Sequence, residues 1–411
     1  MITDDLLRKE TNMRFSSVPF FAGISLLGLS TLPTAAQTRP EHVILWVVDG
    51  ISDKAPDRVD LPNLKALMAQ GVYYRQNYTV ETADPSHVPG QWSTYHTSSI
   101  PNPVLLAGTA MLRPGDQHYV QESFFPLKVT AHVVNEIAYR ALNVGVHYTA
   151  QVGGSLMRGA GYQTGDDQTL SWATYFLHTA KPTFMLIHMQ DTGFAGSMSR
   201  SAPAGSPYKD NIWGEGSPYR KTIAQQDVYL GKFVEELKKE GIWDKTVIFL
   251  TGDHGQTETG WHPLDASEAW SMPLVIAGPG VKKDQKFEYA EAIDVVPTLC
   301  YLMGVAPPIN ADGRILAEAL VSPPATIAPR QQKIKELDFA LLDVGNAIEK
   351  LKAAQPAVAG GRGGSGPNLV ADAERDYYKI ERILEWNKFG TYDRLIDHHK
   401  RLVQRINASL K

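Results

Sequence analysis

The sequence predicts an α/β protein whose mostly parallel central sheet is flanked by helices, with a C-terminal helical appendage. From about residue 42 to 322, apolar segments of strand length alternate with amphipathic segments of helical period, which is typical of βαβ units. A proline-rich segment at 322–330 follows. Beyond it, apolar residues recur three and four positions apart, as in a helix–helix seam: Ile334, Leu337, Leu341, Val344, Ile348 and Leu351. We therefore expect a targeting segment at 1–36, a main domain at 37–322 and a helical region at 331–411.

The main domain opens with a continuous apolar run at 43–48, which indicates a strand buried on both faces. A helix should begin within 61–67, because Pro62 is tolerated in the first turn, and Gly71 should end it. The strand Tyr73–Val80 follows directly. Another buried strand is expected at 184–187, where the chain is again continuously apolar.

The second half of this domain repeats the alternation. A helix is expected at 222–240, because Val228, Phe233, Val234 and Leu237 lie on one stripe and charged residues lie elsewhere. Gly241 should end this helix, and the apolar run at 247–250 should form the next strand. In the C-terminal region, a glycine-rich stretch at 359–367 precedes two more amphipathic helices, around 377–384 and 395–406. We expect these helices to pack on the main domain or on another subunit.

The composition is that of a globular enzyme rather than a nucleic-acid-binding protein. The 411 residues, 43% apolar and 20% charged, suffice for a large core. The net charge is −4 and no basic stripe dominates, so no nucleic-acid partner is expected. The single cysteine, Cys300, excludes an intrachain disulfide and a cysteine-rich zinc site. Its apolar surroundings predict a buried, structural thiol.

The N-terminal segment has the parts of a secretory signal peptide. A possible start at Met13 is followed by arginine, an apolar stretch from Val18 to Leu32, and small residues up to Ala36. The apolar stretch is short and interrupted by proline and glycine, so no permanent membrane span is expected. We expect cleavage near Ala36 and a periplasmic or secreted protein.

Three acidic residues each follow one of the predicted strands: Asp49, Asp191 and Asp253. Because the carboxyl ends of parallel strands meet in one crevice, these carboxylates should lie close together. They would repel one another unless a cation lay between them. His254 directly follows Asp253 and can reach the same cation, and His262 follows after eight more residues. The pattern therefore predicts a metal site, although Val-Asp-Gly at 48–50 would by itself indicate only a turn.

These segments together resemble the alkaline phosphatase superfamily, and within it the type I phosphodiesterase/nucleotide pyrophosphatase and sulfatase-like branches. The resemblance covers about residues 42–308. It is carried by Asp49, by Ser99-Ile-Pro-Asn102 before an apolar segment, by Asp191, by Asp253-His254-Gly255, and by segments 273–280 and 294–299, which resemble the family's late strand and closing helix. It implies a metal-assisted hydrolase with a hydroxyl nucleophile beside the metal.

The resemblance makes Ser99 the nucleophile and gives Asn102 the role of holding the phosphoryl oxygens. Ser99 lies 50 positions after Asp49, which is longer than this pattern usually shows. An earlier segment after the strand has Ala83 where the nucleophile should stand. Thr82 or Ser86 would then have to substitute, so both remain alternatives to Ser99.

The resemblance also implies one or two divalent ions. Asp49, Asp253 and His254 would hold the first, and Asp191 and His262 the second. Two-zinc members carry Gly-His a few residues after the middle aspartate, and segment 191–195 lacks that histidine. The second metal is therefore weak, absent, or completed by another group such as His188. Imidazole and carboxylate ligands favour zinc, while calcium or manganese suits a more oxygen-rich site.

The function predicted from these residues is an exported, metal-dependent hydrolase of small-molecule phosphate esters, of phosphodiesterase or pyrophosphatase type. One alternative is a sulfatase-like enzyme, which Pro103 disfavours because it stands where the sulfatase motif has arginine. Another is a degenerate, non-catalytic member that binds a phosphorylated or sulfated ligand.

Overall fold

A computed structural model of the protein describes residues 39–79, 94–99, 106–107, 110–111, 119–135, 142–152, 165–263, 266–309, 311–326, 329–354 and 392–411. The predicted targeting segment, Thr82, Ser86, Asn102 and the amphipathic segment around 377–384 lie outside these residues.

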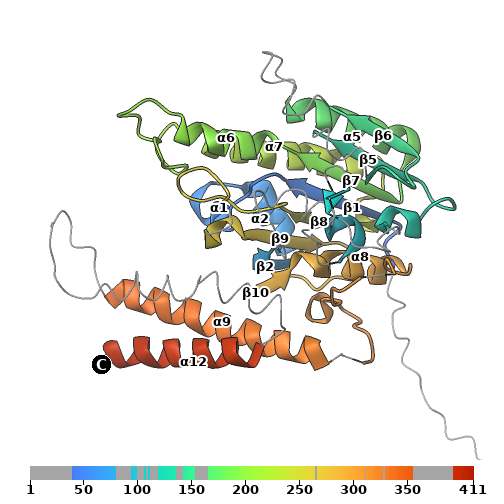
Figure 1. The fold of residues 1–411 in the computed structure, drawn as a ribbon. Helices are drawn as coiled ribbons and strands as arrows, with labels where there is room; N and C mark the ends of the chain where they lie inside the picture. Colours follow the sequence, from blue (N-terminus) through green and yellow to red (C-terminus); the bar gives the residue numbers. More distant parts are fainter. Residues whose placement is uncertain are drawn as a thin grey trace, which may run out of the picture. The chain divides into compact units, whose positions relative to one another are not determined.

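The described residues form an eight-stranded sheet in the order β10-β2-β9-β8-β1-β7-β5-β6. Its order runs from bottom to top in Figure 1. The strands are β1 (His42–Val48), β2 (Gly71–Tyr78), β5 (Thr130–Val134), β6 (Tyr148–Gln151), β7 (Phe184–Met189), β8 (Thr246–Thr251), β9 (Ser271–Ala277) and β10 (Gln285–Glu291). Only β9 is antiparallel to its neighbours among these strands, which confirms a mostly parallel sheet. A separate two-stranded sheet pairs β3 (Leu106–Ala107) with β4 (Ala110–Met111).

The helices of the main domain are α1 (Ala55–Arg58), α2 (Pro62–Ala69), α5 (Asp166–Ala180), α6 (Asp191–Arg200), α7 (Pro218–Lys239) and α8 (Val295–Met303), with 3-10 turns η1 (Val120–Ser123), η3 (Trp243–Lys245), η4 (Ser267–Ala269), η5 (Ala292–Asp294) and η6 (Ala317–Ala319). Three of these helices, α2, α7 and α8, correspond to the helices expected at 61–67, 222–240 and 294–299, and the others were not individually predicted. Pro62 stands in the first turn of α2. Gly241, at φ 68°, takes the left-handed conformation just after α7, which favours glycine there.

The strands β1, β7 and β8 form the centre of the core. Every residue of β7 and β8 is buried, and so is β1 except at its first residue. Burial on both faces explains why their sequences are continuously apolar. Trp46 of β1 packs against Phe233 of α7, with ring centroids 5.5 Å apart. The central strands thus place the residues that follow their ends at fixed levels of the sheet.

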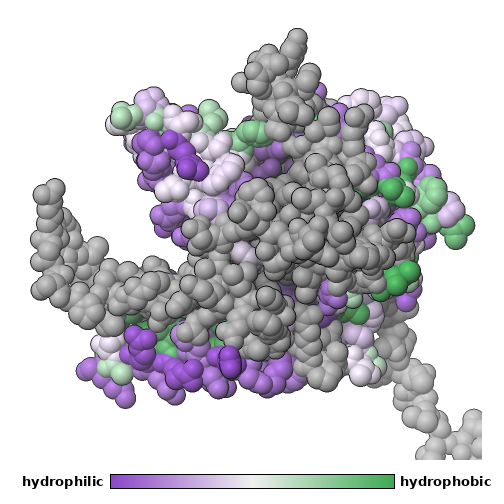
Figure 2. Space-filling model, viewed as in Figure 1, coloured by the Kyte–Doolittle hydropathy of each residue, from purple (hydrophilic) through white to green (hydrophobic). Residues whose placement is uncertain are grey.

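The C-terminal helices α9 (Pro329–Ala354) and α12 (Tyr392–Ser409) pack on each other and beside the edge strand β10, as Figure 1 shows. A buried cluster joins their apolar seams to the main domain and contains Leu337, Leu341, Val344, Ile348, Leu351, Leu395, Leu402, Ile406, Tyr78, Trp270 and Tyr289. The visible outer surface of these helices is mostly hydrophilic (Figure 2).

A carboxylate on α9 also closes the edge of the sheet. Oδ1 of Asp338 accepts backbone hydrogen bonds from Glu288 (2.6 Å) and Tyr289 (2.9 Å) of β10. Such a contact covers unpaired N–H groups of an edge strand. None of the helices within the described residues is both long and apolar enough to cross a membrane.

Candidate metal centre

The carboxyl ends of the parallel strands β1, β7 and β8 bring the predicted acidic residues to the same side of the sheet, here called the carboxyl edge. In the parallel register, Val48 lies beside Met189, and Val47 lies beside Thr251. The Asp49 N–H donates to the Met189 carbonyl at 2.8 Å, which continues the β1–β7 ladder by one residue. Asp49 and Asp253 therefore leave neighbouring strands at the same level.

Asp49, His188 and Asp253 form a buried cluster at this edge. One ligand atom of each lies within 4.8 Å of the other two. The side chains of His188 and Asp253 are fully buried, and Asp49 is 7% exposed. Two carboxylates and an imidazole that converge out of water are a donor set suited to a divalent cation.

Asp253 uses its two oxygens differently. Oδ1 accepts hydrogen bonds from the backbone N–H groups of Gly50 (3.0 Å) and His254 (2.9 Å). Oδ2 accepts no hydrogen bond, although it is buried. It lies 3.9 Å from Nε2 of His188 and 3.8 Å from Nε2 of His254. One oxygen thus fixes the side chain and the other is left for a ligand.

The same neighbours set the ionisation of Asp253. Burial opposes the charged form, but the imidazole of His254, and next that of His188, lower the pKa of Asp253 below its usual range. The carboxylate is therefore ionised at neutral pH, which is the form that binds a cation.

His254 is oriented by a backbone carbonyl. Its Nδ1 lies 2.7 Å from the Gly255 oxygen, and because a carbonyl only accepts, Nδ1 is the donor. Nε2 then faces the cluster, 3.5 Å from Oδ1 of Asp49. Metal-binding histidines are commonly fixed through their other ring nitrogen in this way. His254 is thus a fourth candidate ligand.

The separations within this group fit a single ion. Ligands bound about 2.0–2.2 Å from one zinc ion at tetrahedral angles lie roughly 3.3–3.6 Å apart. Three of the separations between a ring nitrogen and a carboxylate oxygen are 3.5, 3.8 and 3.9 Å, and the ligand atoms of Asp49, His188 and Asp253 lie within 4.8 Å of one another. Small side-chain adjustments would bring these atoms to a common centre, and the buried Oδ2 of Asp253 would gain the partner it lacks.

Asp191 does not belong to the three-residue cluster found among the described residues. It is the first residue of α6, and its Oδ2 accepts the backbone N–H of Asp166 at 2.9 Å. In return, Oδ2 of Asp166 accepts a hydrogen bond from the Asp191 N–H at 2.9 Å. Burial, and next the Asp191 carboxylate, raise the pKa of Asp166. This reciprocal pair joins the starts of α5 and α6.

Glycine on α6 makes room for the first cluster. A Cβ atom at Gly193 would lie 1.8 Å from Oδ1 of Asp49, so only glycine permits this approach. Phe194 follows, where two-zinc relatives of the predicted type would carry histidine. Segment 191–195 therefore brings the backbone of Gly193 against the Asp49 carboxylate and supplies no imidazole ligand.

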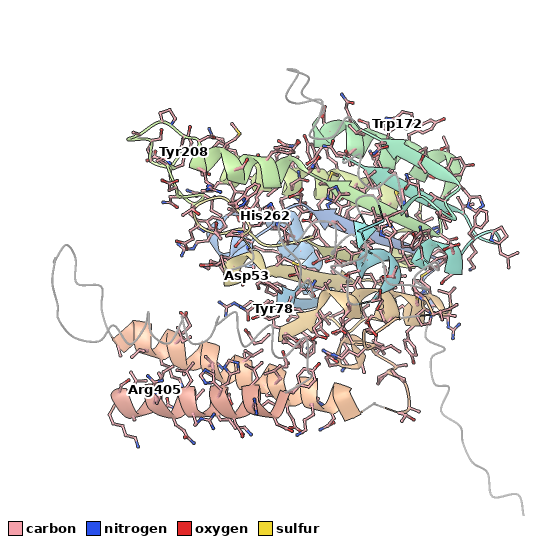
Figure 3. All side chains as sticks on the ribbon, in the orientation of Figure 1. Asp53, Tyr78, Trp172, Tyr208, His262 and Arg405 are labelled. Atoms are coloured by element: carbon pink, nitrogen blue, oxygen red, sulfur yellow. The ribbon has the colours of Figure 1, made fainter. Side chains whose placement is uncertain are left out.

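His262 lies over His254 rather than within the cluster. The ring centroids of His254 and His262 lie 3.9 Å apart. Trp261 stacks on His262, with ring centroids 4.3 Å apart. His262 is partly exposed. In the view of Figure 3, His262 and Asp53 lie toward the same side of the sheet, and Trp172 lies on α5 away from both.

Ser99 is buried next to a helical turn at 94–97 that contacts the strand ends. Its Oγ lies 2.8 Å from Oγ1 of Thr97. The hydroxyl of Tyr95 in that turn donates to the Gly252 carbonyl at 2.5 Å, directly before Asp253. The neighbouring Ser98 donates to the Ile293 carbonyl at 2.6 Å. The segment that carries Ser99 is thus attached to the strand end that carries Asp253.

Two residues of this edge were not identified as site residues by the sequence. The sequence offers His188 only as a group that completes a second metal site, whereas the structure places it in the first cluster. A histidine inside an apolar central strand needs a polar partner, and that signal could have assigned it. Asp166 reads as an ordinary acidic first turn of a helix, so no sequence signal marked it.

A family model and known relatives match this chain. Residues 146–305 match the Sulfatase family model. Arylsulfatase K of Bos taurus is 28% identical over 124 residues, 29% of this chain and 22% of the relative. The multifunctional alkaline phosphatase superfamily protein PehA of Trinickia caryophylli is 33% identical over 105 residues, 24% of this chain and 20% of the relative. The chain thus spans about a fifth of the length of each of these relatives.

The fold is also found in solved structures. The phosphonate monoester hydrolase from Silicibacter pomeroyi aligns with a TM-score of 0.53 at 18% identity, over 70% of this chain and 78% of that protein. The chain thus has an alkaline phosphatase-like fold, and residues 146–305 match the Sulfatase family model, which confirms the resemblance predicted from the sequence.

Proposed function

We propose that this sulfatase-like chain is an exported, metal-dependent hydrolase of phosphate esters, of phosphodiesterase or pyrophosphatase type. The observation that carries the proposal is the convergence of Asp49, His188 and Asp253, with His254 beside them. These residues would hold one divalent cation, with zinc favoured by the mixed nitrogen and oxygen donors. Asp191 and His262 stay the proposed ligands of a second, weaker ion.

Ser99 is the proposed nucleophile. A bound divalent cation makes a nearby hydroxyl more acidic and neutralises charge that develops on the ester. The Ser99 oxygen attacks phosphorus and loses its proton to water, the bond from phosphorus to the leaving oxygen breaks, and the leaving alcohol takes up a proton from water. Water then attacks the phosphoserine ester and regenerates the Ser99 hydroxyl. The Asn102 amide is proposed to donate to a phosphoryl oxygen.

Two features favour phosphate over sulfate esters. Sulfatases of this superfamily mature a cysteine or serine within a motif that continues to arginine, and Pro103 stands at the arginine position. The single cysteine lies in α8, where burial raises the pKa of the Cys300 thiol to about 12 and makes it unreactive. The Sulfatase-family match is the observation that favours the second candidate, a sulfuric ester hydrolase.

The direct test is Ser99→Ala, with p-nitrophenyl phosphate, bis-p-nitrophenyl phosphate and p-nitrophenyl sulfate as substrates. We expect turnover of a phosphate ester by the wild type and its loss in Ser99→Ala, with metal content and melting temperature unchanged. Ser98→Ala is the matched control, because its hydroxyl bonds the Ile293 carbonyl. It should keep turnover.

Each other outcome of this assay selects an alternative. Near-normal turnover in Ser99→Ala removes Ser99 from the role and directs the same test to Thr82→Ala and Ser86→Ala. Turnover of the sulfate ester alone favours the sulfatase. Bound metal without any turnover favours a non-catalytic binding protein. Export is tested separately by N-terminal sequencing of the mature protein, which should begin near Gln37.

A further inference from the structure

The side chain of Gln256 is the least explained polar group near the metal centre. It is 1% exposed. Neither Oε1 nor Nε2 has a hydrogen-bond partner. A buried amide without partners destabilises a fold.

The chain makes space for this amide. A Cβ atom at Gly196 would lie 1.8 Å from Nε2 of Gln256, and one at Gly50 would lie 3.1 Å from Oε1. Gly50 is in the left-handed region at φ 63°, where a side chain is strained in any case. Two separate segments, the end of β1 and the helix α6, therefore leave room for one glutamine.

The amide lies beside the residues of the proposed metal centre. Gly50 donates its N–H to Asp253, and a Cβ at Gly50 would also lie 3.3 Å from Cε1 of His254. On α6, Gly196 is one helical turn beyond Gly193, which contacts the Asp49 carboxylate. Gln256 therefore lies next to Asp49 along the same helix face.

We propose that Gln256 is a substrate-binding residue whose amide Nε2 donates a hydrogen bond to a non-bridging oxygen of the bound anionic ester. This inference rests on the proposed function. The amide is a neutral donor near the carboxylates of Asp49 and Asp253. It can therefore bind an anion without a charged side chain that would compete with the metal ion for these carboxylates. The absence of a partner for Nε2 in the free protein then has a reason, because the ligand oxygen supplies the missing acceptor.

The test replaces Gln256 by methionine, which has a similar length and no amide. Removing an unpaired buried amide should leave the melting temperature of the ligand-free protein equal or raise it. The kcat/KM for the phosphate ester should fall roughly ten- to a hundredfold, the range for a hydrogen bond to a charged group. Gln256→Glu keeps the shape but adds negative charge, so its loss should be larger.

Gln121→Met is the matched control. The Gln121 side chain is also buried, but its Nε2 donates to the Leu142 and Val144 carbonyls, both at 2.8 Å. These residues precede β5 and β6 and lie at the end of the sheet opposite the metal centre. We expect Gln121→Met to lower the melting temperature and to keep kcat/KM within about twofold of the wild type.

Two readouts separate this inference from the proposed function. A wild type that turns over the ester, with Gln256→Met within about twofold of it, overturns the inference alone. A loss of activity in Gln256→Met that is fully explained by a lowered melting temperature also overturns the inference. If the wild type turns over no ester, the proposed function fails, and inorganic phosphate then tests the amide. A phosphate-induced rise in melting temperature that is the same in wild type and Gln256→Met, or absent in both, refutes the inference.

Discussion

Substituting Asp253 by asparagine tests the metal centre with little change in shape. The asparagine Oδ1 can still accept from the Gly50 and His254 N–H groups, which lie 3.0 and 2.9 Å from the aspartate oxygen. What changes is Oδ2, the buried atom without a hydrogen bond, which becomes an NH2 group. The substitution therefore removes one metal ligand and leaves the local fold in place.

The size of the effect follows from linkage. A cation at a hundredfold excess over its Kd stabilises the native state by about 2.7 kcal/mol. At about 2.1 cal/mol/K per residue, this raises the melting temperature of a chain of this length by roughly 3 °C. We expect zinc to produce this shift in the wild type and not in Asp253→Asn. Turnover should fall at least ~100-fold in the variant, equivalent to about 2.7 kcal/mol of barrier.

Asp227→Asn is the matched control for thermal melts with and without zinc. The Asp227 carboxylate is also buried and also accepts two backbone hydrogen bonds, from Asn63 (3.1 Å) and Leu64 (2.7 Å) at the start of α2. This variant should lose stability but keep the zinc shift. Equal zinc shifts in Asp253→Asn and the wild type would show that Asp253 binds no metal, and the assignment of this cluster would be wrong.

Two further predictions concern packing and pH. Gly193→Ala should abolish the zinc-induced rise in melting temperature, because the added Cβ would displace the Asp49 carboxylate. Gly345→Ala in α9 is the control: its added Cβ has its nearest contact at 3.6 Å, so denaturant titration should show a stabilisation of about 0.5–1 kcal/mol. A normal zinc shift in Gly193→Ala would contradict the prediction. Burial raises the pKa of Asp338 from 3.8 to about 7, so between these values the native state binds the proton that the unfolded state has released. Stability should therefore fall as pH rises from about 4 to 7, by at most about 4 kcal/mol, and Asp338→Asn should lose this slope; parallel pH profiles would refute it.

The central strands were predictable because burial on both faces leaves a clear trace in the sequence. The runs at 43–48, 184–187 and 247–250 are continuously apolar, and each lies within a strand of the parallel centre. The antiparallel direction of β9 was not predictable in this way, because an apolar run carries no information on strand direction. Direction is fixed by the connections and by hydrogen-bond pairing with β2 and β8.

The site was predictable to the extent that it depends on strand ends. Asp49 directly follows β1, and Asp253 and His254 come within three residues of the end of β8, so topology brings them together. Asp191 also follows a strand end, yet its carboxylate accepts the N–H of Asp166. Side-chain direction within a loop depends on such local hydrogen bonds, which spacing along the sequence does not reveal. The place of His188 in the first cluster was hard to predict for a related reason, because a residue within a buried strand is expected first to be part of the core.

The C-terminal helices bear on the metal centre through the backbone of one loop. Gly255, which holds the ring of His254 through its carbonyl, donates its own N–H to the Ala269 carbonyl at 2.9 Å. Ala269 and Trp270 are fully or almost fully buried and belong to the same cluster as Leu341 of α9. A path of direct contacts therefore leads from the helix pair to a proposed metal ligand. Because packed interiors resist small displacements, the packing of Ala269 and Trp270 in this cluster connects the helix pair to the backbone that orients His254.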